Sequence, residues 1–226
     1  MMNIALDGPS GAGKSTLAKA LAKKLGYIYT DTGAMYRTIG LAVKRRGIEP
    51  TDTDTVTAAL PAIKISLRFE NGEQKIYLGE EDVGGLIRTN EISAYASKVS
   101  AIPAVRAHLL DVQRTIAKEN NVIMDGRDIG TVILPHAQVK FFVTVSDAER
   151  ARRRYNELIA KGENVRLEEV ATAMAERDRQ DSTREIAPAI PAEDAIFLDN
   201  SGDFDAVIDL AIAIIRDKAK EAGETV

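Results

Sequence analysis

The residues with the clearest chemical potential lie near the N-terminus, in the run Gly8-Pro9-Ser10-Gly11-Ala12-Gly13-Lys14-Ser15. A short apolar run precedes it, and a helical pattern follows from Thr16. A strand, then G-x-x-x-x-G-K-S, then a helix is the context that distinguishes a P-loop from an ordinary glycine-rich turn. In a P-loop, backbone N–H groups and the positive end of the helix dipole surround phosphate oxygens. The motif therefore predicts a nucleoside triphosphate site, with Lys14 at the β- and γ-phosphates and the Ser15 hydroxyl at Mg²⁺.

Arginine recurs at or just beyond the expected strand ends, where packing alone rarely requires it. A phosphoryl-transfer enzyme needs such side chains, because it holds two anionic groups in line and neutralises charge on the transferred group. Arginine suits this task because its planar guanidinium binds phosphate through two hydrogen bonds. The candidates that could converge on the P-loop are Arg37, Arg106, Arg127, Arg177 and Arg184.

Most of these arginines also have a plain structural interpretation. Those on expected helices could lie on solvated faces. The spacing of Arg177, Asp181 and Arg184 is typical of salt bridges within one helix. The arginine-rich run 150–154 is typical of a charged surface. Residue types alone therefore leave both interpretations open at these positions.

The segment Asp125-Gly126-Arg127 is the hardest to explain without a function, because it ends a buried apolar run. Asp125 could be a carboxylate that holds Mg²⁺ beside the P-loop. Alternatively, the carboxylate and the guanidinium could bind the polar edge and the phosphate of a substrate. His108 and His136 have no partners at metal-ligand spacing, so we interpret both as structural or surface residues.

Short apolar runs alternate with helical patterns along most of the chain, which predicts a parallel sheet with helices on both faces. The runs expected to form strands are 3–7, 27–29, 122–124, 139–145 and 195–198. Helical spacing is clear after the P-loop, where Leu17, Leu21 and Leu25 share one face. Further helical patterns end near Gly47, begin at Pro103 and Glu149, and span 92–99, 167–184 and 207–215. We therefore expect an α/β, three-layer P-loop NTPase-type fold with about five parallel strands.

Residues 50–104 interrupt this rhythm. Apolar residues alternate with polar ones over 63–69 and again over 76–78, with Asn71-Gly72 between them. Alternation on both sides of an Asn-Gly pair is typical of an antiparallel β-hairpin with one exposed face. We therefore interpret this segment as an insert into the α/β core.

The composition limits the classes of function. A chain of 226 residues with 45% hydrophobic residues suits one domain with inserts or two small ones. Its net charge of −4 gives no overall electrostatic reason to bind nucleic acid. We see no signal peptide and no apolar run of roughly 18 residues, so we expect no membrane segment. The absence of cysteine excludes disulfides and thiolate metal sites, and we expect a cytoplasmic protein.

Taken together, these residues resemble those of bacterial-type cytidylate kinases, which belong to the P-loop nucleoside monophosphate kinase superfamily. The similarity extends over nearly the whole chain, and the segment from Asp125 combined with the insert is far more specific than the P-loop alone. The matching segments are Gly8 to Thr16, Asp31-Thr32-Gly33-Ala34-Met35-Tyr36-Arg37, Ile87-Arg88-Thr89, Asp125-Gly126-Arg127-Asp128-Ile129-Gly130-Thr131-Val132, the helix start at Glu149, and Glu176-Arg177-Asp178 with Asp181 and Arg184.

The resemblance implies a reaction in which ATP and CMP or dCMP give ADP and CDP or dCDP, with Mg²⁺ as cofactor. It implies one kinase domain over 1–226, which contains a monophosphate-binding region over 36–104 and a short helical lid over 149–166 that closes over ATP. The implied partners are small nucleotides, with no nucleic acid and no membrane. We expect a monomer, because nothing in the sequence requires more than one chain.

Matching positions also imply roles for individual residues. ATP contacts would come from Gly8, Pro9, Ser10, Gly11, Ala12, Gly13, Lys14, Ser15, Thr16, Arg150, Arg153 and Arg154. CMP contacts would come from Thr32, Arg37, Ser97, Arg106, Asp125, Arg127, Arg177, Asp181 and Arg184. The catalytic residues would be Lys14, Arg127 and Arg184. The metal-side hydroxyl would be that of Ser15, with Thr16 as the alternative.

Within the CMP set, the resemblance assigns each residue to a part of the substrate. The pyrimidine would meet Ser97, Arg106 and Asp125, with the Thr32 region nearby. The acceptor phosphate would be held by Arg37 and Arg127, and the sugar by Arg177 and Asp181. Arg184 would lie near the transferred phosphate. On this basis Asp125 is a substrate residue and not a metal ligand.

Two alternative functions remain to be tested against this one. The first is a kinase of another small metabolite on the same core, against which the insert and the segment 125–127 argue. The second is a regulatory GTPase or nucleotide-dependent binding protein. Such a protein would need a guanine-reading Asn-Lys-x-Asp motif, and no asparagine in this chain is followed by lysine.

Overall fold

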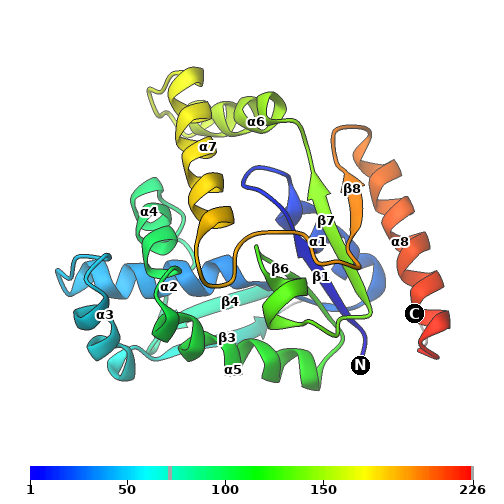
Figure 1. The fold of residues 1–226 in the computed structure, drawn as a ribbon, viewed down its shortest axis with the longest axis horizontal. Helices are drawn as coiled ribbons and strands as arrows, with labels where there is room; N and C mark the ends of the chain where they lie inside the picture. Colours follow the sequence, from blue (N-terminus) through cyan, green and yellow to red (C-terminus); the bar gives the residue numbers. More distant parts are fainter. Residues whose placement is uncertain (71–72, 225–226) are drawn as a thin grey trace.

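The computed structural model describes residues 1–70 and 73–224 and contains two sheets (Figure 1). The larger is a five-stranded parallel sheet with the strand order β2-β6-β1-β7-β8. Its strands are β1 (Asn3–Asp7), β2 (Ile28–Asp31), β6 (Val122–Asp125), β7 (Val139–Thr144) and β8 (Ile196–Asp199). These strands coincide closely with the apolar runs of the sequence, so the predicted α/β fold with about five parallel strands is confirmed.

The register of the central strands brings their carboxyl ends together. Leu6 lies opposite Asp125 across the β1–β6 pair, and Asp31 lies opposite Asp125 across the β2–β6 pair. The polar side chains that end these strands therefore meet at one edge of the sheet, beside the loop that follows β1. The apolar positions earlier in β1 and β6 are buried because both faces of a parallel sheet are covered.

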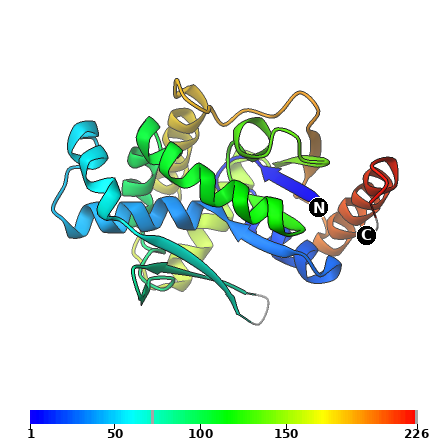
Figure 2. The same cartoon turned by 90° about the horizontal axis from the view of Figure 1, so that it is seen from below.

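Helices cover both faces of this sheet (Figures 1 and 2). On one face, α1 (Lys14–Leu25) and α8 (Phe204–Glu221) pack against β1, β7 and β8, and Leu17 is fully buried there. On the other face lie α5 (Pro103–Glu119) and a short π-helical segment, η2 (Ile129–Ile133). The predicted three-layer arrangement is therefore confirmed.

A second core forms around the insert. It contains apolar side chains of α2 (Thr32–Arg45) and α4 (Asn90–Val99), and of the small antiparallel sheet β3-β4-β5. The strands of this sheet are β3 (Ile65–Glu70), β4 (Glu73–Leu78) and β5 (Glu81–Asp82). The predicted pairing of the two hairpin strands is confirmed (Figure 2). The Asn71-Gly72 turn itself lies outside the described residues.

Some elements were not expected from the sequence. Helix α3 (Thr53–Ala59), followed by a 3₁₀ turn, η1 (Leu60–Ala62), buries only Val56 among its own seven residues, so it has no apolar stripe. It begins where Asp52 caps it, because the Asp52 carboxylate accepts a hydrogen bond from Thr55 N at 3.1 Å. The third strand β5 and the segment η2 also carry no periodic pattern, since each is only a few residues long.

Helices α6 (Asp147–Ala160) and α7 (Leu167–Thr183) lie side by side above the carboxyl edge of the parallel sheet (Figure 1). Helix α6 begins two residues before the expected start at Glu149, because the Ser146 hydroxyl accepts a hydrogen bond from Glu149 N at 3.3 Å and caps the helix there. None of the helices in the described parts of the chain is both long and apolar enough to cross a membrane.

Candidate functional site

A cavity of about 430 Å³ opens at the carboxyl edge of the parallel sheet, between the P-loop, α2, α4, α5 and the helices α6 and α7. Its volume is within the usual range for small-molecule sites. Its lining contains five carboxylates and eight cationic side chains, a local surplus of positive charge in a chain of net charge −4. The cations are Lys14, Arg37, Arg106, Arg127, Arg153, Arg154, Arg177 and Arg184. The cavity is therefore suited to anionic ligands.

The P-loop forms one side of this cavity. Gly8 has φ +141°, and a Cβ at this position would lie 2.3 Å from the carbonyl oxygen of Val143, so the loop requires glycine there. Gly13 precedes α1 with φ +83°, and no side chain caps the helix N-terminus. The first N–H groups of α1 are therefore free to bind an anion. Lys14 Nζ donates a hydrogen bond to Pro9 O at 2.7 Å, and burial followed by the charge of Arg127 lowers the pKa of Lys14.

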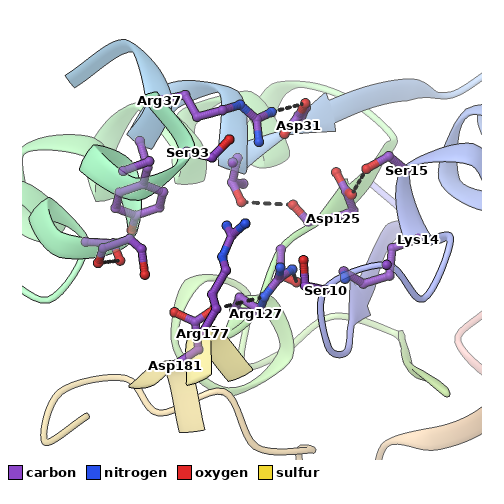
Figure 3. A pocket seen from close by; sticks show the side chains of 18 of the residues that line it. Ser10, Lys14, Ser15, Asp31, Arg37, Ser93, Asp125, Arg127, Arg177 and Asp181 are labelled. Atoms are coloured by element: carbon purple, nitrogen blue, oxygen red, sulfur yellow. Dashed lines mark hydrogen bonds and ion pairs between the residues drawn. The ribbon is translucent and has the colours of Figure 1, made fainter. Parts of the chain in front are cut away.

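Asp125 lies directly beside this loop (Figure 3). The Ser15 hydroxyl donates to Asp125 Oδ2 at 2.6 Å, and the Tyr29 hydroxyl donates to Asp125 Oδ1 at 3.1 Å. Burial, and secondarily the charge of Asp31, raises the pKa of Asp125 to about 6. The P-loop side of the cavity thus holds a serine hydroxyl and a carboxylate, two oxygen groups of the kind that Mg²⁺ prefers.

A cluster of arginines lies near these groups in the cavity (Figure 3). Arg37 pairs with Asp31 at 2.9 Å, and Arg127 pairs with Asp181 at 3.3 Å. Arg177 has no ion pair and no hydrogen bond to any residue in the described ranges. Burial, followed by the charge of Arg127, lowers the pKa of Arg177 to about 10. Arg177 is half-buried, and its Nε is buried without a hydrogen-bond partner in the described ranges. A partly desolvated guanidinium without a carboxylate is unfavourable unless an anion binds it, so Arg177 is a candidate site for an anionic group.

The side of the cavity next to α5 is organised differently. Arg106 donates a hydrogen bond to Asp128, and Arg184 Nη2 lies 3.4 Å from the other oxygen of the same carboxylate. Arg184 also lies 3.7 Å from Asp181 Oδ1, and the guanidinium of Arg106 lies 5.4 Å from the centre of the Tyr36 ring. The cations on this side are matched by buried carboxylates, so they form a satisfied polar network.

Of the three arginines of α6 in the predicted ATP set, two reach the cavity and one does not. Arg153 Nη2 donates to Asn200 O at 2.9 Å, and Arg154 Nη1 donates to Glu157 at 2.7 Å. Arg150 does not line the cavity, and its Nη groups bond to Ser10 O, Asp147 and Asp178. Its expected contact with ATP has no support in this geometry, because the protein itself occupies the guanidinium.

The structure brings most of the predicted residues together. All nine residues of the predicted CMP set line the cavity. The members of the predicted ATP set that line it are Ser10, Gly11, Gly13, Lys14, Ser15, Arg153 and Arg154. Those that do not are Gly8, Pro9, Ala12, Thr16 and Arg150. Of the two candidate hydroxyls, only that of Ser15 faces the cavity.

Asp125 lies elsewhere than expected, and Asp128, for which no role was predicted, takes part in the site. Asp125 was expected with Ser97 and Arg106, but it lies against Ser15, because β6 ends in register with β2 beside the P-loop. The chain then turns and carries Asp128 to Arg106. Sequence reasoning could have considered Asp128, since it stands in the same Asp-Gly-Arg-Asp segment, but spacing does not tell which carboxylate faces which side.

The sequence reasoning also missed Asp7, which ends β1. Its Oδ1 accepts a hydrogen bond from Ile129 N at 2.8 Å, and its Oδ2 accepts one from Gly130 N at 2.7 Å. Burial raises the pKa of Asp7 to about 6. A charged residue within a buried apolar strand is the signal that could have found it. Through these bonds Asp7 holds the start of η2 and thus the loop that carries Arg127 and Asp128.

Comparison with known proteins agrees with this arrangement. The family model described as cytidylate kinase matches residues 4–217. A cytidylate kinase of Geobacter sulfurreducens is 50% identical over 219 residues, which cover 96% of this chain and 94% of that protein. A cytidylate kinase of Streptococcus thermophilus is 45% identical over 221 residues, with 97% of this chain and 96% of that protein covered.

Solved structures show the same fold at low sequence identity. A gluconokinase from Sinorhizobium meliloti superposes with a TM-score of 0.50 at 14% identity, covering 98% of this chain and 95% of that one. This likeness concerns the fold alone. The family match and the similar proteins each extend over nearly the whole chain, and the chain therefore belongs to the cytidylate kinase family.

Proposed function

We propose that the protein transfers a phosphoryl group from ATP to CMP or dCMP, giving ADP and CDP or dCDP, in pyrimidine nucleotide metabolism. The observation that carries this proposal is one cavity with two unlike sides. The N-terminus of the P-loop helix α1 lies on one side, and the polar network around Asp128 lies on the other. The guanidinium of Arg177, which has no ion pair in the described ranges, reaches into the cavity with Arg37 and Arg127. Such a cavity suits two phosphate-bearing ligands better than one.

The donor phosphates would bind at the P-loop. The free N–H groups of α1 would cradle them, and Lys14 would neutralise charge that develops on the transferred group. Arg153 and Arg154, which line the same cavity from α6, would approach from the lid side.

The donor set at the P-loop fits Mg²⁺. The Ser15 hydroxyl would hold the ion, and the carboxylate of Asp125 stands 2.6 Å from that hydroxyl. The described residues contain no group of three acidic or histidine side chains that could hold a metal by themselves. This suits Mg²⁺, which keeps waters and binds nucleotide phosphates with few protein ligands. When bound, the ion supplies charge neutralisation and orientation of the phosphates.

The acceptor phosphate would bind at Arg177, Arg37 and Arg127. This revises two roles that the resemblance implied. Arg177 lines the cavity with Arg37 and Arg127 and has no ion pair in the described ranges, which supports a role at the phosphate, whereas Arg184 pairs with Asp128 and Asp181. We therefore assign Arg177 to phosphate, and Arg184 to the network that faces the base and sugar.

The pyrimidine would bind at Arg106 and Asp128. Cytosine presents an amino group that donates and ring atoms that accept, and a carboxylate beside a guanidinium complements this edge. Uracil has a carbonyl oxygen in place of the amino group, so it would face the Asp128 carboxylate with like polarity. Ser97 lines the same cavity and could add a hydroxyl contact. The network therefore favours CMP over UMP.

Residues 36–104 would form the monophosphate-binding region, and residues 149–166 the lid. Closure of these parts over both nucleotides would keep water from the γ-phosphate. Small-angle scattering should show compaction with both nucleotides, and an unchanged radius of gyration would contradict closure. The cysteine-free composition suits a reducing compartment, and we propose that a monomer acts in the cytoplasm.

An ADP-release assay with ATP and each of CMP, dCMP, UMP, AMP and GMP tests the proposal. We expect CMP and dCMP to be the best acceptors. Preference for AMP or GMP would overturn the assignment of the base site. ATP turnover that ignores every acceptor would favour a nucleotide-dependent switch, and activity with none of the nucleotides would favour a kinase of another metabolite.

A further inference from the structure

The peptide unit between Pro9 and Ser10 is held from both of its ends. On one side, Pro9 O accepts a hydrogen bond from Lys14 Nζ at 2.7 Å. On the other side, Ser10 N donates to Asp178 Oδ1 of α7 at 3.0 Å. A single peptide plane therefore links a carboxylate of the lid-side helix α7 to the ammonium group of Lys14.

Arg150 of α6 completes this arrangement. Its Nη1 donates both to Ser10 O, at 2.7 Å, and to the second oxygen of Asp178. Only 6% of Arg150 is exposed. Helix α7 also packs closely on the loop, since a Cβ at Gly11 would lie 2.8 Å from the terminal methyl of Met174. Helices α6 and α7 thus enclose the part of the P-loop that contains Ser10 and Gly11. The proposed contacts with ATP do not by themselves require this enclosure.

The physical consequence falls on Lys14. Within the described ranges, Pro9 O is the one hydrogen-bond acceptor of its Nζ, and no carboxylate forms an ion pair with it. A carboxylate bonded to a peptide N–H polarises that peptide and makes its carbonyl oxygen a stronger acceptor. Because an ammonium group has three donors, one proton can stay on Pro9 O while two face phosphate. The peptide is therefore what positions the ammonium.

We propose that Asp178, supported by Arg150, is a positioning residue that sets the place of Lys14 through the Pro9–Ser10 peptide. Through it, the position of α6 and α7 is communicated to the lysine that neutralises the transferred phosphate. The inference rests on the proposed phosphoryl transfer, because its effect on rate requires that reaction. It also makes a statement about the ligand-free protein that does not depend on any reaction.

A competing interpretation is that Asp178 only fastens α7 to the loop. The fastening and positioning interpretations predict different effects of a substitution at Asp178. Fastening alone would alter the stability and would leave the environment of Lys14 as it is. Positioning would alter the turnover and the environment of Lys14, with the affinity for CMP retained, because the acceptor groups are on other elements.

The test substitutes Asp178→Asn and uses Glu176→Gln as the matched control. Glu176 is also a carboxylate of α7, but it is exposed and bonds only to Arg179 and Gln180. For Asp178→Asn we expect kcat to fall at least about tenfold, with KM for CMP within about twofold of wild type. For Glu176→Gln we expect both constants to be unchanged. Thermal melting should show that each variant is folded.

A second readout needs no activity. The ¹³Cε signal of Lys14, assigned by its loss in Lys14→Arg, should shift and broaden in ligand-free Asp178→Asn and stay in place in Glu176→Gln. An unchanged Lys14 signal, or a kcat equal to wild type, would overturn the inference. Absence of CMP kinase activity in the wild-type protein would instead overturn the proposed function, and the Lys14 signal would still test the positioning.

A third variant covers the case in which Asp178→Asn does not fold. Arg150→Lys keeps the charge but cannot bridge Ser10 O and Asp178 with one planar group. It should lower kcat in the same direction and by a smaller factor, and it should move the Lys14 signal. If both variants fail to fold, the contacts serve the stability of the domain and the inference is wrong.

Discussion

Both sides of the cavity contain cationic side chains, but the two sides differ in whether carboxylates neutralise these cations in the free protein. On the P-loop side, no side chain among the described residues caps the N–H groups of α1, and none of their carboxylates forms an ion pair with Arg177 or Lys14. On the α5 side, Arg106 and Arg184 share the carboxylate of Asp128. The first side is incomplete until an anion binds, whereas the second is complete in the free protein. This difference suggests that phosphate binding is paired with stabilisation, and that base recognition depends on a rigid network.

The largest expected effect concerns Lys14. Lys14→Ala should lower kcat by about 10²–10³-fold with a much smaller change in KM, because the lysine neutralises charge that develops during transfer. Steady-state kinetics with saturating ATP and CMP measures this. A variant with raised KM and retained kcat would show that Lys14 only binds the ground state.

Asp128→Asn should disrupt the hydrogen-bonded network on the α5 side of the cavity. It leaves Arg106 and Arg184 without their shared charge, so we expect a loss of about 3–5 kcal/mol in the free energy of unfolding. The ratio of kcat/KM for CMP to that for UMP should fall by about tenfold, since an amide can also donate to uracil. Denaturant unfolding and the two kinetic constants test these outcomes, and an unchanged ratio would place the base elsewhere.

Arg177→Met should separate activity from stability on the unsatisfied side. We expect kcat/KM for CMP to fall by about 10–100-fold, because the acceptor phosphate loses a charged hydrogen-bond donor. The melting temperature of the ligand-free protein should be retained or rise by up to about 2–4 °C, since a half-buried guanidinium with an unpartnered Nε is removed. A fall in both quantities would mean that Arg177 has a structural partner in the free protein.

The last expected effect is a pH dependence of stability at Asp125, which is confined to part of the pH range. Its pKa in the folded protein, about 6, lies above the ordinary value of 3.8, so the folded state binds more protons between these values. Stability contributed by this group therefore falls as pH rises from about 4 to about 6, and it is constant above that range. Relative to wild type, ligand-free Asp125→Asn should gain up to ~3 kcal/mol between pH 4 and pH 7. A difference independent of pH would show that Asp125 titrates normally.

The sequence was sufficient to predict the features that lie where a strand ends or a helix begins. The P-loop was recognised because glycine, lysine and serine stand between an apolar run and a helix. The strands were recognised because both faces of β1 and β6 are buried, which produces continuous apolar runs. The set of residues around the cavity came from the resemblance to cytidylate kinases, together with the arginines that recur at or beyond the expected strand ends.

Directions and pairings were harder to predict. Asp125 and Asp128 are three residues apart, and only the turn after β6 sends one to Ser15 and the other to Arg106. Arg150 and Arg153 are both arginines of the same run on α6, and the sequence does not distinguish them. In the structure, however, Arg150 bonds to Ser10 O and to Asp178. Such outcomes depend on how helices α6 and α7 meet the P-loop, and a linear pattern carries no information about that contact.

The most direct test is a crystal structure of the protein with CMP bound. We expect the cytosine amino group at the carboxylate of Asp128, with Arg106 on the same edge of the base. We expect the phosphate of CMP at the guanidinium of Arg177, directed toward Lys14. A base edge bound to Asp125, or a phosphate bound between Arg106 and Arg184, would contradict the division of the cavity into two sides.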